Sequence, residues 1–399
     1  MRTLLLGISG LCCVGVVLAE EDAKSTTMDI YGFAMLDNGY QSKQNDPDWF
    51  DVVRPTKLPA FEDQFGADGD WFASVRQSRF GVKTSTPTGL GDLKTQFEFE
   101  LFGTGVDAGQ TTFRLRHAYG ELGQFGAGQT WSPFMDIDVF PNSLEYWGPN
   151  GMVFFRNVQV RWMPIKGDYT RLTFALERPG ASADQGEYAD RIELENIAPH
   201  FQYPDVSGEF RLGGEDWGYV EIAGIVRWIE WEDQLADQFD LSGDEMGWGV
   251  NLSSNLKLGN STLRLQVVYG EGIQNYMNDA PEDVGIRNNF ADPVRPIVGE
   301  VLPVLGVVAF IDINWSDSMS TSVGYSMVDI DNSDGQSDDA FKHGDYALAN
   351  ILFTPVKNFM LGPEIQYGRR ENFRDGFTSD DVRVQVSFKY SFSKTFGGE

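Results

Sequence analysis

Basic residues recur in this chain at alternate positions of short segments whose remaining positions are apolar. Arg161, for example, lies between Val160 and Trp162. Successive side chains of a β-strand point to opposite faces, so in each such strand the basic set would share one face and the apolar set the other. Cations gathered along a wall that faces water would attract anions. The predicted basic ladder comprises Arg79, Lys83, Arg114, Arg116, Arg161, Arg171, Arg264, Arg370 and Arg383.

An acidic set lies in the segment 132–153, which separates two predicted strands. Its carboxylates belong to Asp136, Asp138 and Glu145. If this loop folds into a lumen, they would face the ladder, and opposed rows of charge would create a transverse field. Two alternatives remain open. In the first, the arginines only pair with the loop carboxylates and hold the loop in place. In the second, carboxylates on the same inner wall, such as Glu98, weaken a preference for anions.

The last strand, 381–392, is the clearest element that would position such side chains. Its apolar face comprises Val382, Val384, Val386, Phe388, Tyr390 and Phe392, and its polar face comprises Arg383, Gln385, Ser387, Lys389 and Ser391. An alternation over about 11 residues is typical of a strand that crosses a bilayer at a tilt. This segment therefore predicts a strand with one face toward lipid and the other toward water.

The same pattern recurs along the whole chain, and short turns alternate with long loops between its repeats. The predicted strands are 28–39, 77–84, 93–101, 113–119, 124–131, 157–162, 171–176, 197–213, 217–231, 246–257, 262–270, 304–315, 320–330, 345–353, 359–370 and 381–392. An even number of strands with this asymmetry is typical of a bacterial outer-membrane barrel. The prediction is an all-β, 16-stranded antiparallel transmembrane β-barrel with short periplasmic turns, long external loops and an inward-folded constriction loop, wide enough for an aqueous channel.

The first residues predict export from the cytoplasm. Arg2 precedes an apolar run that ends before Ala19, and acidic residues follow, as in a cleaved signal peptide. The predicted organisation is a signal peptide at 1–19, a short segment at 20–27, the barrel at 28–392 and a C-terminal extension at 393–399. Both cysteines lie in the signal peptide, so the mature chain has no disulfide or thiolate site. A formal net charge of −28 argues against nucleic-acid binding.

No motif predicts a cofactor, a metal site or an enzyme. The chain has 3 histidines, which are isolated in the sequence, and the calcium-like run 329–335 has its glycine one place late. Two rival functions remain open. One is an adhesin or receptor that uses long acidic external loops, and the other is an outer-membrane hydrolase on the same fold that would need His117.

Several short motifs resemble the DcaP-like porins of Gram-negative outer membranes. The segments that carry the resemblance are 76–81 (RQSRFG), 114–119 (RLRHAY), 126–132 (GAGQTWS) and 217–220 (WGYV), together with the closing strand. The resemblance implies a trimeric, 16-stranded porin in the outer membrane that favours small anionic solutes, dicarboxylates among them.

The end of the last strand, at Tyr390 and Phe392, resembles the C-terminal signal that the outer-membrane insertion machinery reads. Further expected partners are outer-membrane lipid and lipopolysaccharide, which divalent cations would bridge to the acidic loops. The small residues Gly32 and Ala34 are candidates for the outward contact between subunits.

Overall fold

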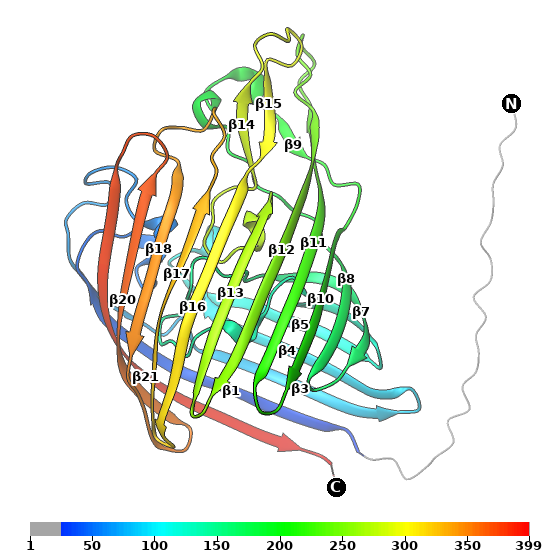
Figure 1. Ribbon diagram of the computed structural model, residues 1–399, viewed down its shortest axis with the longest axis vertical. Coiled ribbons are helices and arrows are strands. Elements are labelled where there is room, and N and C mark those ends of the chain that lie inside the picture. The colour runs from blue at the N-terminus through cyan, green and yellow to red at the C-terminus, as the bar shows by residue number, and fades with distance from the viewer. Residues whose placement is uncertain (1–24, 399) are drawn as a thin grey trace, which may run out of the picture.

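The computed structural model of the chain describes residues 25–398, so the predicted signal peptide at 1–19 lies outside the described residues. In this structure 16 strands pair antiparallel with their neighbours in chain order. The first strand pairs with both the second and the last, so the sheet closes on itself, as Figure 1 shows with the blue and red strands side by side. The predicted 16-stranded antiparallel barrel is confirmed.

The strands of the barrel are β1 (Thr27–Gln41), β3 (Arg79–Thr88), β4 (Gly91–Phe102), β5 (Thr111–Leu122), β6 (Phe125–Trp131), β7 (Arg156–Lys166), β8 (Thr170–Glu177), β10 (Asp205–Gly214), β11 (Gly218–Asp233), β12 (Gly243–Leu258), β13 (Ser261–Glu271), β16 (Pro303–Ser316), β17 (Met319–Ile330), β18 (Phe341–Asn350) continued by β19 (Leu352–Val356), β20 (Phe359–Asn372) and β21 (Thr378–Phe396). Two short strands, β2 (Asp70–Ser74) and β9 (Ile197–Pro199), pair with β1 and β11. A separate hairpin consists of β14 (Val284–Asn288) and β15 (Ile297–Val301).

The helical turns are all single turns of 3-10 helix in the loops. They are η1 (Pro47–Trp49), η2 (Pro55–Lys57), η3 (Gly105–Asp107), η4 (Ile137–Val139), η5 (Gly186–Tyr188), η6 (Ile192–Leu194) and η7 (Gln274–Tyr276). Within residues 25–398 no helix is long and apolar enough to cross a membrane.

Turns and loops alternate between the two ends of the barrel. We call these the short-turn end and the long-loop end. Between β12 and β13 the turn is only Gly259 and Asn260, and Gly259 has a φ of +62°, a conformation that favours glycine. At the other end, the β14–β15 hairpin rises above most of the barrel strands, and β9 lies beside the end of β11, with which it pairs (Figure 1).

The alternation of the last strand is present in the structure as predicted. Val382, Val384 and Val386 are exposed on the outside of the barrel, whereas Arg383 and Gln385 are fully buried on the inside. In a membrane the exposed apolar band would be covered by lipid. Sequence periodicity therefore identified the outward face correctly on this strand.

Part of the inner face is apolar, which the sequence analysis did not predict. Val268, Val308 and Phe310 face inward and form a buried cluster with Phe134 and Met152 from the loop between β6 and β7. The outward and inward positions of β16 are both apolar because this strand packs against lipid on one side and against the loop on the other. The expectation that every inward side chain lines water is therefore wrong.

Most strand boundaries differ from the predicted ones by a few residues, and two of the differences concern the predicted strand 197–213 and the C-terminus. The predicted strand 197–213 is divided, because β9 ends at Pro199 and β10 begins only at Asp205, after Pro204. Proline has no N–H to donate to a ladder, so it interrupts regular pairing here. At the C-terminus β21 continues past Phe392 to Phe396, which pairs with Met28.

Candidate functional site

The loop between β6 and β7, residues 132–155, lies inside the barrel, and we call it the constriction loop. The amide of Asn251 on β12 donates to the Phe134 carbonyl at 3.0 Å. The backbone N–H of Leu144 donates to Glu364 on β20 at 2.7 Å. Because β12 and β20 are separated by four other strands of the barrel, a loop bound to both crosses the interior.

Two acids of the constriction loop bind an arginine outside the predicted ladder. Asp136 and Asp138 each lie 2.6 Å from the guanidinium group of Arg211 on β10. The hydroxyl of Ser253 also donates to Asp136, at 2.6 Å. These carboxylates therefore anchor the loop to the β10–β12 wall and do not face the β3–β5 part of the ladder.

The third predicted acid, Glu145, joins the constriction loop to the first loop of the barrel. Its carboxylate accepts backbone N–H groups of Val53, Trp147 and Gly148 at 3.2, 2.9 and 2.6 Å. The hydroxyl of Tyr346 donates to it at 3.1 Å. Burial raises the pKa of Glu145 to about 7, although a guanidinium group and backbone N–H groups nearby oppose that shift. Glu145 is thus held by backbone N–H groups of the two loops and by Tyr346 of β18, with the Arg383 guanidinium group nearby.

The first loop, residues 42–69, also enters the barrel, which the sequence analysis did not predict. The guanidinium group of Arg54 lies 4.1 Å from the ring centroids of both Trp49 and Trp147. Its Nε donates to Asp279 at 2.8 Å. A cation between two aromatic rings is stabilised by the ring faces. The aromatic and apolar residues of this otherwise acidic loop were the sequence signal that could have predicted its position inside the barrel.

The inner wall formed by β3, β4, β5 and the start of β7 holds a group of charges that we call the basic cluster. It comprises Arg79, Arg114, Arg116, Arg156, Glu98 and Glu100. Arg116 binds both carboxylates, at 2.6 Å to Glu98 and 2.5 Å to Glu100. The other three arginines lie 3.4 to 3.7 Å from Glu100. Four guanidinium groups surround two carboxylates, so the cluster has a formal excess of two positive charges.

The members of the basic cluster differ in their access to the lumen. The side chains of Arg79 and Arg114 are 25% and 31% exposed, whereas those of Arg116 and Arg156 are only 5% and 6% exposed. Lys389 on β21 lies beside Arg79, since both cations lie near the Phe33 ring, at 4.2 and 5.3 Å. The exposed cations face the open part of the lumen, and the buried pair holds Glu100.

A β-bulge in β5 brings the arginines of this strand together. Glu98 pairs with His117, whereas the next residue, Phe99, pairs with Leu115, so Arg116 has no partner on β4. A bulge adds one residue to one strand of a pair and shifts the alternation beyond it. Arg116 and His117 are consequently both buried on the inner side.

The same bulge reverses the predicted orientation of Tyr119. Regular alternation along the predicted strand 113–119 would place Tyr119 on the outer face with Leu115, opposite the ladder residues Arg114 and Arg116. In the structure its ring lies 5.3 Å from the Arg161 guanidinium group, and it lines a lumen cavity with Lys83. That prediction is therefore wrong, because the alternation of residue types in the sequence does not reveal where a bulge inserts an extra residue.

The structure divides the predicted ladder into separate places. Arg79, Arg114 and Arg116 belong to the basic cluster, and Lys83 lies on the same wall nearer the short-turn end. Elsewhere Arg161 donates to the Trp131 carbonyl, Arg171 lies 4.0 Å from Glu209, Arg264 binds Asp312 at 2.6 Å, Arg370 donates to the Thr56 and Asp339 carbonyls, and Arg383 donates to the Asp51 carbonyl. These five arginines bind carbonyls or single carboxylates of the barrel and its loops.

Several basic residues inside the barrel were missing from the prediction. Among them are Arg54, Arg156, Arg211, Arg227 and Lys389. Arg156 lies one position before a predicted strand, and Arg211 lies in the segment that prolines obscured. Lys389 was assigned to the inward face of its strand but not to the ladder. The alternation contained a clear signal for Lys389 and for Arg227, which lies between the apolar residues Val226 and Trp228.

Cavities follow the wall that carries the basic cluster. One of about 310 Å³ is lined by Arg54 and Arg114, and one of about 300 Å³ is lined by Arg79 and Lys389. Tyr146 of the constriction loop lines both cavities. A further cavity of about 330 Å³ next to β3 and β4 includes Lys83. The lumen path is therefore accompanied by cations from the long-loop end toward the short-turn end.

The two predicted signal residues lie on the outer face of the last strand. Tyr390 is exposed and stacks on Phe359 with ring centroids 4.9 Å apart. Phe392 is also exposed and pairs with Gly32 across the closing seam. Both side chains are thus on the surface that faces lipid.

Comparison with solved structures identifies the fold. The chain is similar to the outer-membrane channel DcaP of Acinetobacter baumannii, with a TM-score of 0.76 and 22% identity over 92% of this chain and 98% of that one. It is also similar to an anion-selective porin from Comamonas acidovorans (TM-score 0.57, 10% identity, 92% and 100% covered). OmpT of Vibrio cholerae, in its trimer form, has a TM-score of 0.55 at 12% identity, with 92% and 100% covered.

A search of curated proteins found no match. The model of the DcaP outer membrane protein family, in contrast, matches residues 22–392, which is nearly all of the chain that forms the barrel. The chain therefore belongs to the DcaP outer membrane protein family and is a β-barrel porin of the outer membrane.

Proposed function

We propose that this porin passes small hydrophilic solutes by passive diffusion and favours anionic ones, dicarboxylates among them. The excess positive charge of the basic cluster, beside the lumen cavities, carries the proposal. A wall of cations stabilises an anion as it leaves bulk water, and rings or rows of Arg and Lys are typical of anion pores. The similarity to a porin that is described as anion-selective supports the same preference.

The exposed arginines have a geometry that suits passage better than tight binding. Arg79 and Arg114 keep part of their surface open while each remains close to Glu100. A carboxylate in the lumen would form charge-assisted hydrogen bonds with one guanidinium group and then with the next. Because Glu100 competes for the same donors, no single site would hold the anion strongly, as conduction requires.

The reversal potential of the purified protein in a planar bilayer tests this proposal. In a KCl gradient we expect a potential of the sign that reports a preference for chloride. A swelling assay with liposomes should rank succinate above glucose and glucose above lysine. A cation-selective reversal potential would contradict the anion preference and leave the barrel unaffected.

We also propose how the chain is exported and assembled. Residues 1–19 would be a cleaved signal peptide, and the short turns would face the periplasm. The outward position of Tyr390 and Phe392 supports their recognition by the insertion machinery, and the acidic long loops would bind lipopolysaccharide through divalent cations. A homotrimer is supported by the similarity to OmpT, which has a trimer form. The N-terminal sequence of the mature protein and its cross-linked mass in native membranes would check these points.

A further inference from the structure

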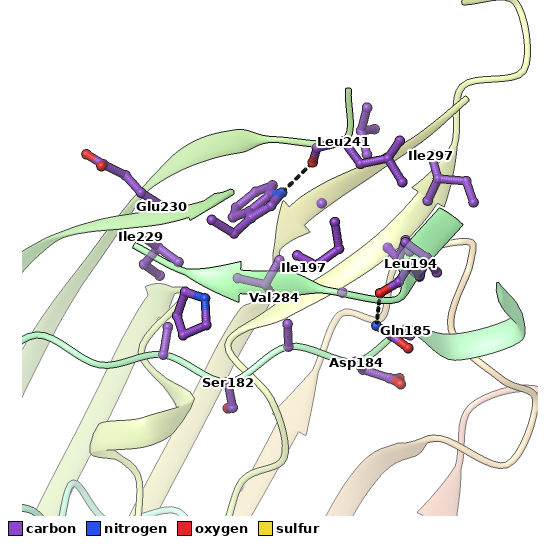
Figure 2. A pocket seen from close by; sticks show the side chains of 18 of the residues that line it. Ser182, Asp184, Gln185, Leu194, Ile197, Ile229, Glu230, Leu241, Val284 and Ile297 are labelled. Atoms are coloured by element: carbon purple, nitrogen blue, oxygen red, sulfur yellow. Dashed lines mark hydrogen bonds between the residues drawn. The ribbon is translucent and has the colours of Figure 1, made fainter. Parts of the chain in front are cut away.

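A cavity at the long-loop end lies apart from the basic cluster, and we call it the loop pocket. It has a volume of about 270 Å³ and lies between the segment 181–185, β9, the end of β11 and the β14–β15 hairpin. These segments are far apart in the sequence, and Figure 2 shows them converging around the pocket. The pocket is therefore a product of the folded loops and not of a single hairpin.

The interior of the loop pocket is apolar. Leu194, Leu241 and Ile297 belong to one buried hydrophobic cluster beside it, and Ile197 packs against that cluster. Figure 2 shows Leu194, Ile197 and Val284 around the cavity. Side chains of this kind give a ligand dispersion contacts and no charge.

The polar groups of the lining are largely bonded within the protein. The Trp231 indole N–H donates to the Leu241 carbonyl at 2.8 Å, and the Gln185 amide donates to the Leu194 carbonyl at 3.1 Å, both drawn as dashed lines in Figure 2. An ordered water needs two to four polar partners. Since these donors are already used, the cavity favours an apolar occupant over water.

The aromatic wall of the pocket is held in a fixed position. The Trp231 ring lies against Gly243 and Gly299, where an added Cβ would come within 2.6 Å of the ring at either position. Because these glycines have no side chains, the Trp231 ring fits between them. The hydrogen bond to the Leu241 carbonyl fixes the orientation of the indole N–H. The pocket is thus preformed, because the ring cannot easily turn to fill it.

We propose that the loop pocket binds a small neutral aromatic or aliphatic molecule. Apolar cavities of about 150 Å³ bind benzene, so this cavity has room for a substituted ring. Asp184 and Glu230 line its edge, and their carboxylates would repel an anion. This chemistry is the opposite of that of the basic cluster, so the inference is independent of the anion preference proposed for the lumen.

Crystals of the full chain soaked with iodobenzene or with 4-iodobenzoate test the site directly. Iodobenzene should give an anomalous iodine peak in the loop pocket, and 4-iodobenzoate should give none there. The proposal is overturned if iodobenzene leaves the pocket empty, or if the charged compound occupies it equally well.

A matched pair of substitutions tests the site in solution. Ile197→Trp fills the pocket, whereas Ile192→Trp places the same side chain on the same loop, at a position that is 66% exposed and outside the lining. In 19F NMR at fixed detergent, broadening of the fluorobenzene signal should fall at least tenfold for Ile197→Trp and stay unchanged for Ile192→Trp. Heat-modifiable migration in gels confirms folding. If Ile197→Trp does not fold, Leu241→Phe is used as the pocket-filling variant in its place. The site would be refuted if a folded pocket-filling variant bound fluorobenzene as well as the unchanged protein does.

Discussion

At the residue scale, Glu100 determines whether four arginines can share one wall. Its side chain is fully buried, and each guanidinium group of the basic cluster lies within 3.7 Å of it. Like charges at such distances repel one another strongly when water is excluded. Glu100 and Glu98 reduce this repulsion without neutralising it. Carboxylates that the sequence suggested would weaken an anion path are therefore what hold its cations in place.

Replacement of Glu100 by Ala should destabilise the barrel by about 3 kcal/mol, because removal of one partner leaves buried cations without compensation. Urea unfolding in lipid vesicles, followed by tryptophan fluorescence, measures this difference. Glu193→Ala, at a partly exposed ion pair with Arg191 in a loop, is the control and should have a much smaller effect. Equal effects of the two substitutions would show that the cluster is not coupled through Glu100.

The double variant Arg79→Gln/Arg114→Gln should lower the anion-to-cation permeability ratio by roughly twofold or more, since it removes the two exposed charges of the cluster. Reversal potentials in KCl gradients measure the ratio. The difference should shrink at high ionic strength because salt screens exposed charges. Arg191→Gln, at the long-loop end, serves as the control, and an unchanged ratio in the double variant would exclude the cluster from selectivity.

At the scale of elements, the constriction loop has an apolar side and a polar side with different roles. Phe134 and Met152 pack against the inner face of the barrel. Asp136 binds Arg211, and Asp138 binds the same guanidinium group. Its acids therefore attach the loop to the β10–β12 wall, whereas the hydroxyl of Tyr146, in the same loop, donates to Glu100 of the basic cluster.

Asp136→Ala should loosen the constriction loop. The Asp136 side chain is fully buried, whereas the Asp138 side chain is 49% exposed. Loss of Asp136 therefore removes a buried partner of the Arg211 guanidinium group, which costs more than loss of a partner that is half exposed to water. We expect single-channel recordings of Asp136→Ala to show added conductance fluctuations. Asp138→Ala should show fewer, and the reverse order would contradict the proposed anchor.

At the scale of the whole molecule, closure of the barrel depends on two strands from opposite ends of the chain. β1 pairs with β21 along its length, from Met28 with Phe396 to Gln41 with Arg383. The buried carboxylate of Asp37 accepts hydrogen bonds from residues of β21, among them Gln385 at 3.0 Å. A closed barrel leaves no strand edge unpaired, which is what a lipid environment requires.

Gly32→Val should weaken this seam. An added Cβ at Gly32 would lie 2.3 Å from the Arg79 carbonyl oxygen and 2.7 Å from the Phe392 ring. Overpacking of this kind costs about 1–3 kcal/mol. The temperature at which the folded band converts to the unfolded band in gel electrophoresis should fall. Ala34→Val, two residues away on the same strand at an exposed position, is the control and should leave that temperature nearly unchanged.

The sequence predicted the strands and their outward faces well, and the site less well. Val382, Val160 and Trp162 were assigned correctly because contact with lipid demands apolar side chains at every second position. Tyr119 was assigned incorrectly because a single bulge residue inverts the alternation after it. Arg211 was missed because prolines obscured the start of its strand.

The sequence alone determined that this chain is a closed barrel, because periodicity is a local property that each strand carries by itself. Only the tertiary structure decided which inward charges meet. Asp136 and Arg211 are far apart in the sequence, and their contact depends on where the constriction loop crosses the barrel. Glu100 meets four arginines because strand register, a bulge and loop packing act together, and no local pattern contains that information.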